Sequence, residues 1–98
     1  MSLALVYKRE ARSDIAEIHD YYESQRVGLG DEFLEELTAV KDRVFRQPKA
    51  NRPIWGEIRR GLFSRFPYGF FYRVTPSRIE VIAVYHHSRD PAGWQGRV

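Results

Sequence analysis

Two strand-like segments near the C-terminus constrain the fold of this chain most. The first runs from Tyr68 to Val74 and the second from Ile79 to Tyr85, and both are rich in aromatic and β-branched residues. The four residues between them, Thr-Pro-Ser-Arg at 75–78, have the composition of a tight turn. The sequence therefore predicts an antiparallel β-hairpin at this end of the chain.

The N-terminal half predicts one strand followed by two helices. Leu3 to Tyr7 is a short apolar run typical of a strand, and apolar residues then recur at helical spacing up to Tyr22. Gly28 and Gly30 interrupt that pattern, and a second helix is expected to begin near Asp31 and to end at Gln47-Pro48. We expect its buried stripe to be Phe33, Leu37, Val40 and Val44. The acidic side chains of the first helix are interpreted as a solvated face: Asp14, Glu17, Asp20 and Glu23.

The remaining segment completes an α+β domain. Residues 48–53 contain two prolines and are predicted to form a loop, after which Ile58 to Phe66 is a third strand-like run despite Gly61. A short connection requires the two helices to lie antiparallel, as a hairpin covering one face of the sheet. We therefore expect one domain over residues 1–98, with an N-terminal strand, a helical hairpin and a three-stranded antiparallel stretch.

Composition excludes several classes of function. The chain of 98 residues contains no cysteine, which removes disulfides, thiolate catalysis and cysteine-rich zinc sites. It has neither an apolar run long enough to span a bilayer nor a secretory signal pattern, so we expect a cytoplasmic protein without a membrane partner. His86 and His87 are adjacent on a strand and would point to opposite faces, so neither a metal site nor a cofactor is expected.

The charges are distributed unevenly along the chain. Residues 1–50 contain 8 Lys/Arg and 10 Asp/Glu, whereas residues 51–98 contain 8 basic and 3 acidic residues. The guanidinium group matches phosphate and carboxylate geometry, which favours an anionic target or an acidic protein partner. The alternative is a solvated sheet face with ordinary surface arginines. The basic residues of this half are Arg52, Arg59, Arg60, Arg65, Arg73, Arg78, Arg89 and Arg97.

The whole pattern resembles a known family. Arg65-Phe66-Pro67-Tyr68 leads into Tyr72-Arg73-Val74, and the last strand is followed by residues 86–91, His-His-Ser-Arg-Asp-Pro, and by Trp94. With the helical hairpin upstream, the chain resembles the RelE/ParE superfamily, the toxins of type II toxin–antitoxin systems, and within it the ParE-like branch. The resemblance implies a bacterial toxin, with a role in plasmid stabilisation, that a cognate antitoxin silences.

Function divides within this superfamily. RelE-like members are ribosome-dependent mRNA endonucleases, whereas characterised ParE toxins poison DNA gyrase. The chain departs from the nuclease pattern at three positions: Gly69 stands where an arginine is common, His87 replaces another arginine, and Trp94 falls near the expected tyrosine. An indole has no titratable proton for acid–base catalysis. The balance favours a gyrase-targeting toxin that is not an enzyme, and the alternative is an mRNA interferase.

Two sets of candidate site residues follow. If the chain is a nuclease, a basic and imidazole cluster would surround the scissile phosphate. The bland interpretation is that one imidazole caps the sheet edge while the other is solvated, that Asp90 before Pro91 begins a turn, and that Trp55 and Trp94 cover the core. The nuclease candidates are Arg59, Arg65, Arg73, His87 and Arg89, and the candidates for target or nucleic-acid contact are Arg60, His86 and Trp94.

The expected partners are a cognate antitoxin and either DNA gyrase or, in the alternative, the ribosome with mRNA. The antitoxin's C-terminal segment is expected to wrap the helical hairpin and the arginine-bearing sheet, with an extended strand as one way of adding to a sheet edge. An open apolar groove would favour a homodimer or a toxin–antitoxin hetero-oligomer. A third possibility is a toxin fold that has lost toxicity.

Overall fold

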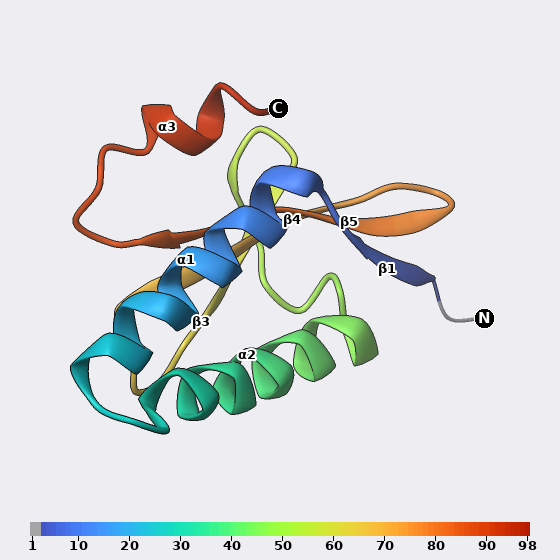
Figure 1. Ribbon diagram of the computed structural model, residues 1–98. Coiled ribbons are helices and arrows are strands. Elements are labelled where there is room, and N and C mark those ends of the chain that lie inside the picture. The colour runs from blue at the N-terminus through green and yellow to red at the C-terminus, as the bar shows by residue number, and fades with distance from the viewer. Residues whose placement is uncertain (1–2) are drawn as a thin grey trace.

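The computed structural model describes residues 3–98 and shows two helices lying on one face of a five-stranded sheet (Figure 1). A short third helix follows the last strand and lies at the opposite end of the molecule from the helical hairpin's turn. The elements in chain order are β1 (Ala4–Tyr7), α1 (Arg9–Gln25), α2 (Leu29–Arg46), β2 (Pro53–Trp55), β3 (Ile58–Leu62), β4 (Tyr68–Val74), β5 (Arg78–His86) and α3 (Ala92–Gln95).

The strand order is β1-β5-β4-β3-β2, with β1 parallel to β5 and every other pair antiparallel. The predicted C-terminal hairpin is confirmed, since Tyr68 lies opposite His86 and Val74 opposite Ile79. The α+β class, the helical hairpin and the β3–β4–β5 antiparallel stretch are also as predicted.

Two details of the sheet differ from the prediction. The segment predicted as a strand to Phe66 ends at Leu62, and residues 63–67 form the turn into β4. The loop prediction also missed β2, a three-residue edge strand that begins at Pro53. Proline is tolerated at the first residue of an edge strand, because no neighbouring strand needs its missing N–H on the open side.

The main core lies between the helical hairpin and the inner face of the sheet. Phe33 and Val40 of α2 and Phe70 and Tyr72 of β4 are all at most 1% exposed. Gly61 of β3 lies directly under α2, and a Cβ at this position would come within 3.1 Å of a methyl carbon of Val40. The predicted stripe of α2 is buried throughout. Within residues 3–98, no helix has the combination of length and apolarity that a membrane span requires.

Candidate functional site

The outer face of the sheet, opposite the helical hairpin, carries a second small core. Trp94 of α3 is 3% exposed and stacks on Phe71 of β4, with ring centroids 4.4 Å apart. The predicted burial of Trp94 is therefore confirmed, and its indole faces the protein. For Trp55 the same prediction is only partly right, because edge strand β2 leaves 43% of this residue exposed, edge-on to Trp94. The other members of this cluster are Ile58, Ile82, Ala83 and Tyr85.

A groove of about 590 Å³ opens beside this cluster, and we call it the outer-face groove. Phe71, Tyr85 and Trp94 form its apolar base, and the exposed side chains of Ile54 and Leu62 lie on its rim. Its cationic and imidazole side chains come from β3 and from the turn after β5. These are Arg60, His86, His87 and Arg89, and the remaining lining residues are Trp55, Pro91 and Gln95.

The side chain of Arg60 lies next to Gly69, one of the three positions where the sequence departs from the nuclease pattern. Leu62 pairs with Gly69, and a Cβ built on Gly69 would come within 3.0 Å of Cδ of Arg60 and 2.8 Å of the Phe71 ring. The space that a side chain at position 69 would need is thus filled by the stem of Arg60 and by an aromatic ring. Glycine at position 69 leaves the space that the stem of Arg60 occupies.

The turn after β5 positions the two histidines differently. Nδ1 of His86 accepts hydrogen bonds from the backbone N–H of Ser88 at 3.0 Å and from its hydroxyl at 2.8 Å. The His87 ring is exposed, as the bland interpretation expected for one of the pair. Partial burial and then the nearby positive charges of Arg60 and His86 lower the pKa of His87 below its ordinary value, so it is mainly neutral at pH 7.

Arg89 and Asp90 continue this turn. The Arg89 guanidinium lies over the Tyr85 ring, 4.1 Å from its centroid, which is a cation–π geometry. A carboxylate oxygen of Asp90 accepts the N–H of Ala92 at 3.0 Å, so Asp90 acts in the turn as the sequence indicated. His87, Arg89 and Arg60 are therefore brought to one groove from two separate segments.

The other three nuclease candidates lie elsewhere and have partners of their own. Arg59 donates to the backbone carbonyls of residues 49 and 51, Arg65 donates to Glu32 at 2.7 Å, and Arg73 donates to Glu80 at 2.7 Å. Arg73, together with Arg78, holds the pKa of Glu80 below its ordinary value. The five candidates do not converge on one point, and their catalytic role stays a prediction.

Asp14 corrects the interpretation of the acidic face of α1. It is 8% exposed and accepts two hydrogen bonds from Arg97, at 2.7 and 3.0 Å, and one from the backbone N–H of Val84 at 3.1 Å. The prediction that Asp14 is solvated is wrong because Asp14 lies three residues after Ala11 and four before Ile18, on the buried face. This pair joins the C-terminal tail to α1.

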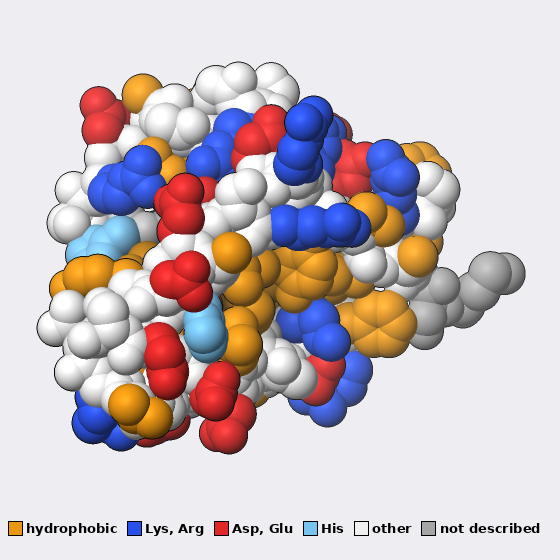
Figure 2. All heavy atoms as spheres, in the orientation of Figure 1, with side chains coloured by type: hydrophobic (Ala, Val, Ile, Leu, Met, Phe, Trp, Pro, Cys, Tyr) orange, Lys and Arg blue, Asp and Glu red, His pale blue; other side chains and the backbone are white. Residues whose placement is uncertain are grey.

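A second groove, on the helix side, lies between α1 and the end of β5 and has a volume of about 420 Å³. Its lining includes Tyr21, Tyr22 and Tyr68, together with the acidic Asp14 and Glu17 and the basic Arg89. Figure 2 shows this face of the molecule, with acidic side chains along α1 and basic side chains gathered toward the C-terminal helix. Burial raises the pKa of Tyr68, so its hydroxyl stays protonated.

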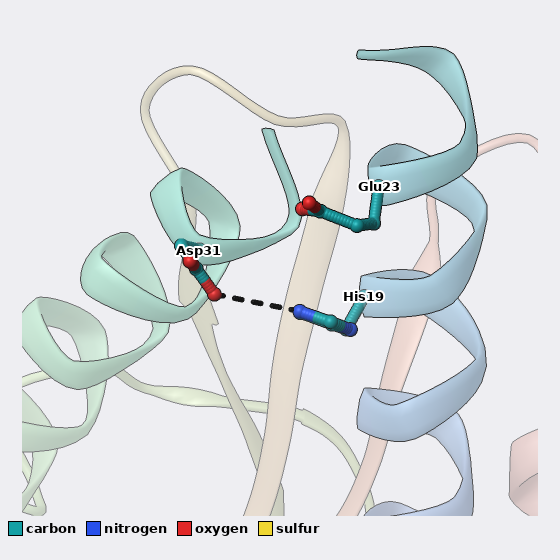
Figure 3. A group of neighbouring side chains, drawn as sticks. All are labelled: His19, Glu23 and Asp31. Carbon is teal, nitrogen blue, oxygen red and sulfur yellow. Dashed lines mark ion pairs between the residues drawn. The ribbon is translucent and has the colours of Figure 1, made fainter. Parts of the chain in front are cut away.

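A third group lies at the turn of the helical hairpin. Figure 3 shows His19 and Glu23 of α1 facing Asp31 at the start of α2, and their ligand-type atoms lie within 4.8 Å of one another. Glu23 accepts the backbone N–H groups of Gly28 and Gly30, and a carboxylate oxygen of Asp31 is 3.5 Å from Nε2 of His19. The hydrogen bond to Asp20, with a further contribution from Asp31, raises the pKa of His19. These contacts tie the two helices together.

Comparison with known proteins supports the sequence-based resemblance. No curated protein sequence matches the chain. Among solved structures, a chain described as "Chromosomal ParDE TA system from P. aeruginosa" has the same fold, with a TM-score of 0.78 and 18% identity over 87% of this chain and 96% of that one. The family model described as "ParE toxin of type II toxin-antitoxin system, parDE" matches residues 5–91. The chain therefore belongs to the ParE toxin family of type II toxin–antitoxin systems.

Proposed function

We propose that this ParE-family toxin inhibits bacterial growth by poisoning DNA gyrase, and that it acts as a binding protein without a catalytic cycle of its own. Such a target would place its action in the cytoplasm. The observation that carries the proposal is the separation of the nuclease candidates. Arg59, Arg65 and Arg73 are held by partners in three different places, whereas phosphoryl-transfer chemistry needs its charges focused on one phosphate.

Two further observations support a binding role. Trp94, near the position of the expected tyrosine, is buried against Phe71 and offers no proton for transfer. Gly69 has no room for the arginine that is common there in the nuclease branch, because Arg60 and Phe71 occupy the space.

Neutralisation by a cognate antitoxin is part of the proposal. The helix-side groove offers apolar and aromatic surface from Ile18, Tyr21 and Tyr22 beside the end of β5. An antitoxin segment that enters this groove would cover surface that otherwise favours self-association. A homodimer of the free toxin is the competing way to cover it, and light scattering with and without antitoxin distinguishes the two.

The test is a gyrase assay with purified components. Relaxed plasmid, gyrase and ATP are incubated with the folded toxin, and linear DNA trapped by denaturation is measured. The proposal predicts that linear DNA accumulates with toxin concentration and disappears when the cognate antitoxin is added first. Normal supercoiling and no linear DNA at toxin concentrations in large excess over gyrase would overturn it.

One observation favours the mRNA interferase as second candidate. His87 is mainly neutral at pH 7 and lies beside Arg60 and Arg89, which is a usable base next to cationic groups. If the toxin cuts mRNA on the ribosome, His87→Ala or Arg89→Ala should lower the cleavage rate about 100-fold or more. Unchanged rates in both variants would exclude this cluster as the catalytic group.

A further inference from the structure

The outer-face groove is cationic and has no acidic residue among those that line it. Within residues 3–98, no carboxylate lies at ion-pair distance from Arg60 or Arg89, although five other arginines have such partners. Guanidinium groups without an ion-pair partner that line one concave surface attract a carboxylate, which they can bind through paired hydrogen bonds.

A contact within the protein restricts Arg89 before any partner binds. The Arg89 guanidinium lies 4.1 Å from the centroid of the Tyr85 ring, and the stem of Arg60 passes close to Gly69. A cation that is already ordered loses less side-chain entropy when it pairs with a carboxylate. Arg89 is thus preorganised to pair with a carboxylate.

The rest of the groove is apolar and open to solvent. Ile54 and Trp55 are each 43% exposed and Leu62 is 51% exposed, which makes them three of the seven large hydrophobic side chains exposed among the described residues. Tryptophan and arginine are enriched at the energetic centre of protein–protein interfaces. The partner should therefore present an apolar side chain next to a carboxylate.

A protein segment fits this surface better than a nucleic acid. Grooves that bind single strands follow several successive phosphates with basic residues and stack bases on exposed aromatic faces. Here only two arginines line the groove, His87 is mainly neutral, and Trp94 and Phe71 stack on each other rather than outward. A volume of about 590 Å³ is in the size range of compact ligand sites, which suits a loop of a folded protein rather than a long wrapping chain.

We propose that the outer-face groove docks an acidic loop of gyrase, with a carboxylate held by Arg60 and Arg89 and an apolar side chain inserted between Trp55 and Leu62. The inference rests on the proposed function and assigns the target-binding surface within it. It places the target on the outer face and the antitoxin in the helix-side groove, with His86 and Arg89 lining both grooves and Arg60 lining only the outer one.

Charge-reversal variants with a matched control provide the test. Arg60→Glu and Arg89→Glu are compared with Arg12→Glu, which makes the same change of charge at an exposed position of α1 without an ion-pair partner among residues 3–98. Arg89 lies in an exposed turn, so its variant should fold even if Arg60→Glu does not. Circular dichroism and thermal unfolding establish that each variant is folded.

Affinity for purified gyrase is measured by biolayer interferometry, and linear DNA is measured in the cleavage assay. We expect roughly tenfold or greater loss of affinity for Arg60→Glu and for Arg89→Glu, with a matching loss of linear DNA, and wild-type values for Arg12→Glu. Affinity for the antitoxin should be unchanged for Arg60→Glu and Arg12→Glu, because neither residue lines the helix-side groove.

The possible failures are distinguishable. If the wild-type toxin yields no linear DNA, the proposed function itself fails. If the wild type poisons gyrase and the folded Arg60→Glu and Arg89→Glu proteins do so equally well, the assignment of the groove is wrong. Selective loss of antitoxin binding, or of binding to a single-stranded RNA oligonucleotide, with gyrase binding intact would also overturn it by identifying a different occupant.

Discussion

Removal of the Asp14–Arg97 pair should strongly destabilise the fold. The two side chains are 9% and 18% exposed, are 83 residues apart in sequence, and form two hydrogen bonds with each other. Asp14 also accepts the N–H of Val84, and Arg97 donates to the carbonyl of Ile82 at 3.2 Å. The pair therefore connects α1, β5 and the C-terminal tail in one network.

The expected magnitudes follow from these contacts. A hydrogen bond to a charged group contributes about 1.5–3 kcal/mol, and a buried amide left without an acceptor costs about 1–3 kcal/mol. Asp14→Ala removes three such bonds, but Arg97 is exposed enough to find water, so we expect a loss of about 3 kcal/mol. Arg97→Ala leaves Asp14 bonded to Val84 and should cost about 2 kcal/mol. At 4–8 °C for each kcal/mol in a domain of this size, Asp14→Ala should lower Tm by about 12–24 °C.

A double-mutant cycle isolates the pair itself. Urea unfolding of the wild type, both single variants and the double variant should give a coupling energy of about 1.5–2 kcal/mol. Glu17→Ala, an exposed carboxylate on the same helix, serves as control and should change stability by no more than about 0.5 kcal/mol. A coupling energy below about 0.5 kcal/mol, typical of exposed pairs, would refute the reasoning.

Two other predictions concern the tail and the pH dependence of stability. A Cβ at Gly93 would overlap the Tyr85 hydroxyl, so Gly93→Ala should displace α3 and cost about 1–3 kcal/mol, measured by thermal unfolding and tryptophan fluorescence; an unchanged Tm would contradict it. Arg73, and then Arg78, lower the pKa of Glu80, so its contribution to stability is present above the unfolded-state pKa of about 4.3 and is lost as pH falls through the lower folded value. Urea unfolding between pH 3 and pH 7 should show that the free energy of unfolding falls less steeply with decreasing pH for Glu80→Gln than for wild type. An equal pH dependence in the two proteins would exclude Glu80 as its source.

Most of the fold could be predicted from local patterns in the sequence, because strand composition, turn residues and helical spacing decide where its main elements form. Aromatic and β-branched composition with turn residues between identified β4 and β5, and helical spacing identified the buried stripe of α2. The edge strand β2 was missed because three residues beginning at Pro53 carry no periodic signal. Asp14 was assigned to the solvated face because it is an acidic residue. Its spacing from Ala11 and Ile18, however, places it on the buried face of the helix.

The outer-face groove could be predicted only in its parts. Arg60, His87 and Arg89 were each candidates, but sequence distance does not show which of them meet. Their meeting depends on strand register, since Leu62 lies opposite Gly69 and Tyr68 lies opposite His86. Arg59, the neighbour of Arg60, points away to the loop carbonyls, because adjacent side chains on a strand face opposite sides.

Gyrase poisoning and mRNA cleavage are distinguished most sharply by a parallel assay of one toxin preparation on both targets. Linear plasmid DNA is measured with purified gyrase, and mRNA cleavage is measured on translating ribosomes, each with and without antitoxin. We expect antitoxin-sensitive linear DNA and intact mRNA. Cleaved mRNA together with undisturbed supercoiling would contradict it and would make the toxin an mRNA interferase.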